Sequence, residues 1–234
     1  MKATILQPTY LPWSGFFEMI SSTDLYVVFD HVQFERKSWQ QRNRIKTANG
    51  EFLLTIPVKK TSRNIRICDV EISYDHENPL EKHWKTITLA YQKAPYFNKY
   101  KKVFENIFNK KPVLLRELNV ELIKAICDIL NIKINIKYSS DLDLNDKNME
   151  RTEKVVNLCK KAGISHLYDA KGAQKFLDTS LFEKEGIAIT FQNFTPPQYN
   201  QSWGDFIPFL SVIDLIFNEG EKSMEIIKSG RGDI

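Results

Sequence analysis

The sequence predicts an α/β protein with a parallel sheet at its core. Two apolar runs, residues 3–7 and 25–29, flank a short helix expected at 16–22. A strand, a helix and a strand in close succession are typical of a parallel unit whose sheet is covered on both faces. Two further observations add a β-hairpin around Asn49-Gly50 and a helical apolar period over residues 79–131.

The hairpin is expected within residues 42–58, where apolar and polar residues alternate on both sides of Asn49-Gly50. This dipeptide favours the left-handed backbone that a tight two-residue turn requires. Another strand is expected at 65–72, which reads IRICDVEI. The parallel unit is therefore followed by an extended, partly antiparallel segment.

Residues 79–131 are predicted to form a helical insertion that packs on the sheet. Apolar residues recur there at spacings of three and four, as one buried face of a helix requires. Pro95 and Pro112 divide the stretch into three helices, because proline cannot continue a helix through its interior.

The α/β pattern returns after the insertion. Strands are expected at 132–138, 164–168 and 187–191, and helices at 149–162 and 171–178. The segment 206–228 is helical in period and strongly apolar, so we expect it to be buried and to close the fold. These elements predict a single domain over residues 1–234.

The overall charge excludes few functions but makes nucleic acid an unexpected partner. The chain of 234 residues carries 33 basic and 29 acidic side chains, a net charge of +4, and its lysines are scattered. No apolar stretch is long enough to span a membrane, and the N-terminal run is too short for a signal peptide. We therefore expect a cytoplasmic protein with a small-molecule substrate.

Metal sites and the common catalytic motifs are not indicated. The three cysteines share no metal-ligand spacing, and none of the four histidines pairs with another at such a spacing. The sequence has no glycine-rich phosphate loop and no Gly-x-Ser-x-Gly motif. It points to no particular cofactor and leaves the oligomeric state open.

The loop between the first strand and the first helix is the first candidate site. The stretch ILQPTYLPWSGFFEMI, residues 5–20, crowds aromatic and turn-forming residues behind a strand end. Ligands of open α/β sheets bind outside the carboxyl ends of the strands, so we expect this loop to be one wall of a small-molecule site. Its candidate binding residues are Gln7, Tyr10, Trp13 and Gly15.

The densest polar stretch, FDHVQFERKSWQQRNRIK at 29–46, gives the second set of candidates. If the hairpin forms, Arg42 and Arg44 lie on one face, and two guanidinium groups there suit a carboxylate or a phosphate. The alternative is that they are surface charges paired with neighbouring acids. The candidates from this stretch are Asp30, Gln33, Trp39, Arg42, Asn43 and Arg44.

Four isolated residues complete the candidates. His83 has a near-neutral pKa suited to acid–base catalysis, although a lone histidine is more often structural. Arg151 at a helix start could hold an anion or could be a solvated first-turn residue. Lys171 and Gly172 lie in a turn whose backbone N–H groups could cradle a ligand, although one glycine is weak evidence.

The chain resembles the WbqC family, bacterial proteins associated with O-antigen and other surface-polysaccharide gene clusters. The similarity runs over nearly the full length, through QPTYLPWSGFFEMI, DHVQF, WQQRNRI, IPVKK, HWKTITLAYQKAPYF, RTEKVVNLCKKAGISHLYDAKGAQKF and FIPFLSVIDLIFNEG. The chain departs from the family pattern at Gln41, where asparagine is common, and in the turn at 169–173. The resemblance supports the residues Gln7, Tyr10, Pro12, Gly15, Asp30, Gln33, Trp39, Arg42, Asn43 and Arg44 as the site.

The first strand, its proline-containing loop and Gly15 also look like the first βα unit of Rossmann-like nucleotidyltransferases with a His-x-Gly-His signature. Trp13 or Ser14, and Phe16, stand at the histidine positions here. These side chains cannot polarise an α-phosphate, so the likeness implies the fold and a nucleotide-sized site rather than direct nucleotidyl transfer.

Together these observations favour a transferase that acts on a nucleotide-activated sugar, or on an acyl or aminoacyl group, in lipopolysaccharide O-antigen or related biosynthesis. Asp30 or His83 would be the base, and Arg42 and Arg44 would bind the anion. One alternative is nucleotide-dependent activation of a small acid. Another is a non-catalytic sugar-binding or assembly protein of the same pathway.

Overall fold

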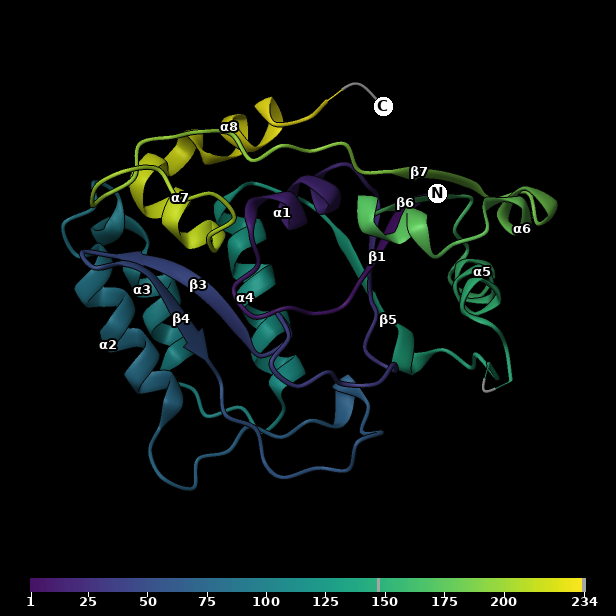
Figure 1. The fold of residues 1–234 in the computed structure, drawn as a ribbon, viewed down its shortest axis with the longest axis horizontal. Coiled ribbons are helices and arrows are strands. Elements are labelled where there is room, and N and C mark those ends of the chain that lie inside the picture. The colour runs from purple at the N-terminus through teal and green to yellow at the C-terminus, as the bar shows by residue number, and fades with distance from the viewer. Residues whose placement is uncertain (147, 233–234) are drawn as a thin grey trace.

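A five-stranded parallel sheet forms the centre of the molecule in the computed structural model, which describes residues 1–146 and 148–232 (Figure 1). Its strands are β1 (Lys2–Leu6), β2 (Leu25–Val28), β5 (Asn135–Tyr138), β6 (His166–Asp169) and β7 (Ala188–Phe191). Their spatial order is β5-β2-β1-β6-β7, and every neighbouring pair is parallel. The predicted α/β fold with a parallel sheet is confirmed.

The strand order places a topological switch point between β1 and β6. The chain moves outward from β1 to β2 and β5 on one side, and then returns to build β6 and β7 on the other side of β1. Connections that leave β1 and β6 in opposite directions open a crevice at the carboxyl ends of the two strands. Proteins with open α/β sheets commonly bind their ligands in this crevice.

Helices cover both faces of the sheet. They are α1 (Ser14–Ser21), α2 (Pro79–Tyr91), α3 (Phe97–Phe108), α4 (Leu115–Ile129), α5 (Arg151–Ala162), α6 (Thr179–Lys184), α7 (Val212–Glu219) and α8 (Ser223–Ser229). Along β2, Tyr26 and Val28 join the large core formed with α1 to α4 and α7, whereas Leu25 and Val27 join a smaller core under α5 and α6. Two-sided burial explains why this strand reads as an unbroken apolar run.

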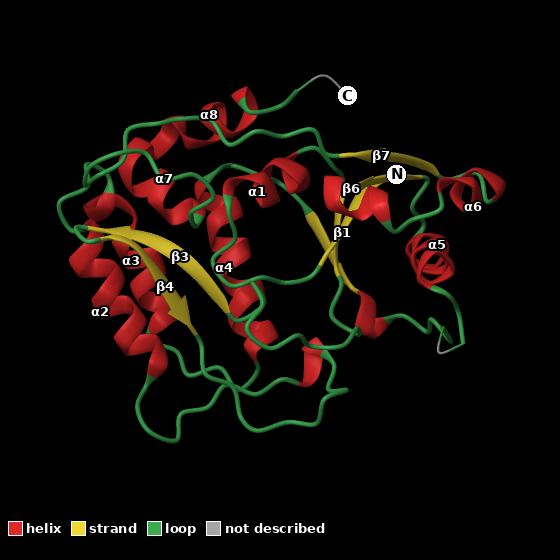
Figure 2. Ribbon diagram, viewed as in Figure 1, coloured by secondary structure: helices red, strands yellow, loops and turns green. Residues whose placement is uncertain are grey.

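The predicted hairpin, β3 (Arg42–Thr47) and β4 (Gly50–Thr55), forms a separate antiparallel pair (Figure 2). Its turn pairs Thr47 with Gly50, whose φ of +93° favours glycine. Ile45 and Leu54 bury into the large core. The hairpin therefore sits on the helices, outside the parallel sheet.

Three predicted elements differ from the structure. Residues 65–72 contain a 3₁₀ turn, Ile67–Asp69, because the backbone N–H groups of Ile67 and Cys68 bond to the loop after β2 instead of to a strand. The helix expected at 171–178 is a 3₁₀ turn over Lys171–Lys175, and α6 begins later, after its N-cap Asp178. The closing helical segment begins only after Ser211, whose hydroxyl caps α7.

Candidate functional site

Two adjoining pockets form a cleft at the switch point. The first, which we call the strand-end pocket, has a volume of about 680 Å³ and lies beyond the carboxyl ends of β1, β2 and β6, beside the start of α5. The second, the aromatic pocket, has a volume of about 250 Å³ and is lined by Thr9, Trp13, Phe16, Trp39, Asn43, Arg44 and Phe209. Thr9 and Phe16 line both pockets, so the two volumes are parts of one cleft.

Asn43 holds the loop after β1 against the hairpin. Its buried amide donates hydrogen bonds to the carbonyl oxygens of Tyr10 at 3.1 Å and Leu11 at 2.7 Å. The Tyr10 N–H donates to the carbonyl of Trp39 at 2.9 Å. Leu11 has a φ of +45°, a conformation that costs energy for leucine and that these bonds hold in place. The N-terminal loop and the Arg-Asn-Arg strand therefore meet in one pocket.

Gly15 makes room for the indole of Trp13. A Cβ at this position would lie 2.3 Å from the indole ring, which is too close for any side chain. The ring packs against Phe194 and Phe209, with centroid separations of 5.5 Å in both cases. The glycine thus positions an aromatic wall and does not itself line either pocket.

The two arginines of β3 share Trp39 as their neighbour. Their guanidinium carbons lie 5.9 Å (Arg42) and 5.4 Å (Arg44) from the centroid of this ring, which is 48% exposed. Arg44 also donates to Glu51 at 2.8 Å, so part of its charge is paired as in the surface alternative. The Nε atoms of both arginines are buried and have no hydrogen-bond partner within the described chain. Arg44 lines the aromatic pocket, whereas Arg42 supports Trp39 from outside it.

Asp169 brings a carboxylate to the strand-end pocket. It is the last residue of β6, and within the described chain its carboxylate accepts one hydrogen bond, at 2.7 Å from the Ala170 N–H. Burial raises the pKa of the Asp169 carboxyl to about 6, although the bond from Ala170 opposes the shift. The sequence analysis missed this residue, although its place directly after a strand is the signal that selected Asp30.

Two cations from the first turn of α5 face the same pocket. Arg151 and Lys154 line it, and neither forms an ion pair with a described acidic residue. The Arg151 guanidinium lies 5.0 Å over the ring of Phe176, which follows the 3₁₀ turn. Lys171 and Gly172 in that turn are exposed and lie outside the pocket lining.

The structure places Asp30 away from the cleft. Its fully buried carboxylate accepts four hydrogen bonds: from Arg116 at 2.7 Å, from the Ser140 N–H and hydroxyl at 2.9 and 3.0 Å, and from the Ser139 hydroxyl at 3.1 Å. These bonds engage both oxygens and connect the end of β2 to α4 and to the turn after β5. This arrangement is that of a structural ion pair, whereas the carboxylate of Asp169 faces the cleft.

His83 is likewise a buried structural partner. Its Nδ1 lies 2.8 Å from the Tyr10 hydroxyl, and burial lowers the pKa of His83 to about 4. Neither residue lines the cleft. Gln33 is also remote, since its exposed side chain donates to the Arg63 carbonyl at 2.8 Å, whereas Gln7 lines the strand-end pocket.

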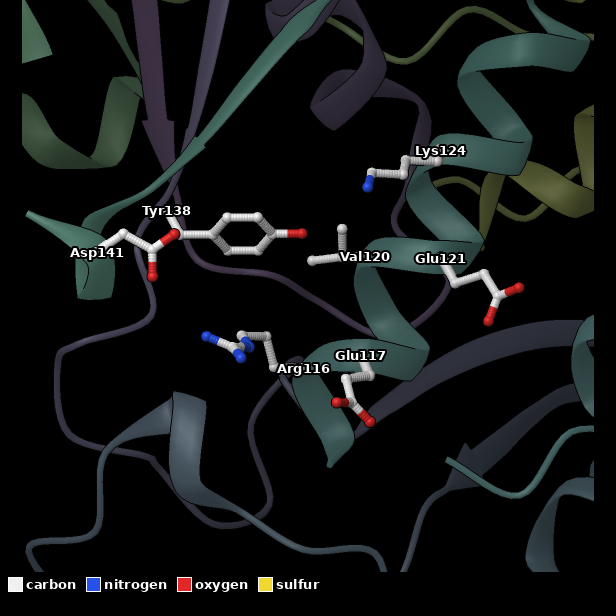
Figure 3. A pocket seen from close by; sticks show the side chains of 7 residues that line it. All are labelled: Arg116, Glu117, Val120, Glu121, Lys124, Tyr138 and Asp141. Carbon is white, nitrogen blue, oxygen red and sulfur yellow. The ribbon is translucent and has the colours of Figure 1, made fainter. Parts of the chain in front are cut away.

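A third pocket, of about 490 Å³, opens on the outer side of α4 (Figure 3). Figure 3 shows Tyr138 extended toward Val120, with Arg116 beside it and acidic side chains around the rim. The guanidinium of Arg116 is already bound to Asp30 and lies 5.3 Å from the Tyr138 ring, so its charge is neutralised. Lys124 also lines this pocket, together with the acidic Glu117, Glu121 and Asp141.

No group of three or more histidine, cysteine, aspartate or glutamate side chains in residues 1–146 and 148–232 is arranged to hold a metal ion. Over the same residues, no helix is long and apolar enough to cross a bilayer.

The structure defines an α/β protein with a cleft at the switch point of a parallel sheet. Residues 7–226 match the model of the WbqC-like protein family, so the chain belongs to this family, as its motifs predicted. The chain is 30% identical over 232 residues to the uncharacterized protein Rv1507c of Mycobacterium tuberculosis (strain ATCC 25618 / H37Rv), and the match covers 97% of each chain. No solved structure matches the chain.

Proposed function

We propose that the protein is a transferase that acts on an activated sugar, or on an acyl or aminoacyl group destined for a sugar, in surface-polysaccharide assembly. The observation that carries this proposal is the aromatic pocket, where Trp13, Trp39 and Phe209 surround a small volume beside Arg44. Aromatic walls bind the apolar faces of a ring, and a few placed polar groups fix its orientation. The pocket suits a sugar ring that carries or adjoins an anionic group.

Arg44 supplies the polar contact of this pocket. Its buried Nε has no acceptor in the described chain, and an unpaired buried donor costs free energy until an acceptor arrives. A carboxylate or phosphate oxygen of the substrate would satisfy that donor. The surrounding indole rings would strengthen the contact, because they exclude water from it.

Asp169 is the proposed base. A carboxyl with a pKa of about 6 is mostly ionised at neutral pH and is a better proton acceptor than an ordinary aspartate. In the proposed reaction it takes the proton of an acceptor hydroxyl or amine. The freed electron pair bonds to the transferred group, and the leaving group departs with the electrons of the broken bond.

The binding role is tested by calorimetric titration of nucleotide-sugars and sugar phosphates into the wild type and the Arg44→Ala variant. Loss of a charged hydrogen bond should weaken binding by about 1.5 to 3 kcal/mol, which is about 10- to 150-fold in Kd. Arg36→Ala is the matched control, because this exposed arginine bonds to Thr61, its one side-chain partner among the described residues, and lies outside the cleft. An unchanged Kd in Arg44→Ala would remove the proposed role.

The catalytic role is tested separately with Asp169→Asn. The amide keeps the size of the side chain and can still accept from the Ala170 N–H, but it cannot take a proton at neutral pH. The variant should therefore bind the ligand and lose turnover by about 100-fold or more. A variant with full turnover would favour another base, and a wild type that binds but transfers nothing would favour the assembly-protein alternative.

A further inference from the structure

We propose that the strand-end pocket binds a nucleoside diphosphate group, with Arg151 and Lys154 on the phosphates and the nucleoside against the apolar wall. This proposal rests on the proposed transferase function, because in a transferase the bound nucleoside diphosphate would belong to the leaving group of an activated donor. Both a nucleotide-sugar and coenzyme A carry this group, so the shared chemistry fits either a sugar or an acyl donor.

The charges of the pocket call for an anion with two or more oxygens. Arg151 and Lys154 lie one helical turn apart on α5, face one cavity and pair with no described acid. Because Arg151 lies over the face of Phe176, that contact leaves its N–H donors free at the edge of the guanidinium plane. Such a fork binds phosphate oxygens in pairs.

Two acids, Glu150 and Asp169, line the pocket with these cations, and neither forms an ion pair with Arg151 or Lys154 in the described chain. Glu150 lines the pocket and is the N-cap residue of α5. The Glu153 side chain accepts from the Glu150 N–H at 2.8 Å. Because no ion pair joins either glutamate to Arg151 or Lys154 in the described chain, the side chains of these two cations remain available to a ligand.

The remaining lining residues indicate which uncharged groups the ligand would carry. The walls are largely apolar, with Phe29 and Phe176 among them, and Phe176 leaves 61% of its surface exposed. Aromatic side chains with free faces bind flat rings by stacking. A plain acyl chain fits less well, because it would bury Asp169 beside groups that offer no hydrogen-bond donor.

The size of the cavity agrees with this ligand. About 680 Å³ lies within the range of pockets that hold cofactors and other small molecules of nucleotide size. The adjoining aromatic pocket of about 250 Å³ is left for the sugar or the transferred group. A donor that spans both compartments would cross the cleft between Thr9 and Phe16.

The experiment is calorimetric titration of the full chain with ADP, UDP, GDP and CDP, followed by coenzyme A and the nucleotide-sugars of whichever base binds. At least one nucleoside diphosphate should bind at least 10-fold more tightly than inorganic phosphate. Arg151→Ala and Lys154→Ala should each raise its Kd by 10- to 100-fold. Lys161→Ala, an exposed lysine on the same helix outside the pocket, should change it less than 2-fold.

The outcomes separate this inference from the proposed function. No binding of any nucleoside diphosphate at millimolar concentration, or binding that ignores Arg151 and Lys154, overturns the inference. Occupancy of the aromatic pocket is read independently by quenching of tryptophan fluorescence, since Trp13 and Trp39 line that pocket and no tryptophan lines the other. If a nucleotide binds but no sugar binding depends on Arg44, the proposed transferase role of the aromatic pocket is contradicted, and the proposed nucleotide site is supported.

Discussion

Asp169 shows how one side chain can be kept at a cost to stability. Its carboxyl has a folded pKa of about 6, above the value of about 3.9 expected in the unfolded chain. The folded state therefore binds more protons than the unfolded state between about pH 4 and pH 6, and stability falls as the pH rises through that window. A residue that lowers stability at neutral pH is typical of a functional site.

Asp169→Asn should remove this pH dependence. The melting temperature of the wild type, measured relative to the variant, should fall as the pH is raised from 4 to 7, and the variant should be the more stable protein at neutral pH. Asp214, whose pKa burial also raises to about 6, is present in both proteins and cancels in the comparison. A difference in melting temperature that stays constant over this range would contradict the assignment.

At the level of single residues, the sequence selected candidate site residues better than it assigned a role to each of them. Asp30 and Asp169 both follow strand ends, and nothing local distinguishes them. What decides their roles is Arg116 and the serines after β5, which reach Asp30 from 86 to 110 positions away. Partners that distant cannot be read from a pattern in a single sequence.

At the level of elements, Asn43 joins the hairpin to the N-terminal loop. In Asn43→Ala, the carbonyl oxygens of Tyr10 and Leu11 lose their donors in a buried position. We expect the free energy of unfolding to fall by about 2 to 4 kcal/mol in urea denaturation. The exposed Asn98, whose side chain accepts a hydrogen bond from Lys101 and from no other described residue, provides the control Asn98→Ala, with a change expected within about 0.5 kcal/mol.

The same variant should also alter the site. Without the clamp, the loop that carries Trp13 is free to leave the hairpin that carries Trp39, so the tryptophan emission should shift to the red. An unchanged spectrum together with unchanged stability would show that the loop is held by other contacts.

Elements with strong local signals were predictable, and those defined by tertiary contacts were not. The apolar run of β2 and the Asn49-Gly50 dipeptide indicated the strand and the hairpin correctly, because burial and turn geometry act on adjacent residues. The turn itself is shifted by one residue, since Ala48 and Asn49 connect the strands and Gly50 begins β4. Residues 65–72 alternate like a strand, yet their backbone bonds go to the loop after β2 and to the chain before α4 instead of to a strand of a sheet. Alternation of apolar and polar residues indicates which side chains are buried. A segment with this pattern joins a sheet only where a partner strand lies beside it.

At the level of the whole molecule, the ion pair between Arg116 and Asp30 links the helices to the sheet. In Arg116→Ala the buried carboxylate of Asp30 loses its cation, and we expect a loss of about 3 to 5 kcal/mol in the free energy of unfolding. Arg66→Ala breaks the ion pair with Asp69, which is largely exposed, and should cost far less. Equal effects of the two changes, measured by urea denaturation, would show that burial of Asp30 does not matter.

The junction of the two pockets at Thr9 and Phe16 also has a practical consequence. Two weakly binding ligand fragments, one among the indole rings and one beside Arg151, would lie on either side of this junction. Joining them with a linker of matching length would make the second contact intramolecular, at an effective concentration in the millimolar range. A bivalent inhibitor built in this way would gain affinity from the architecture of the protein, without any new contact.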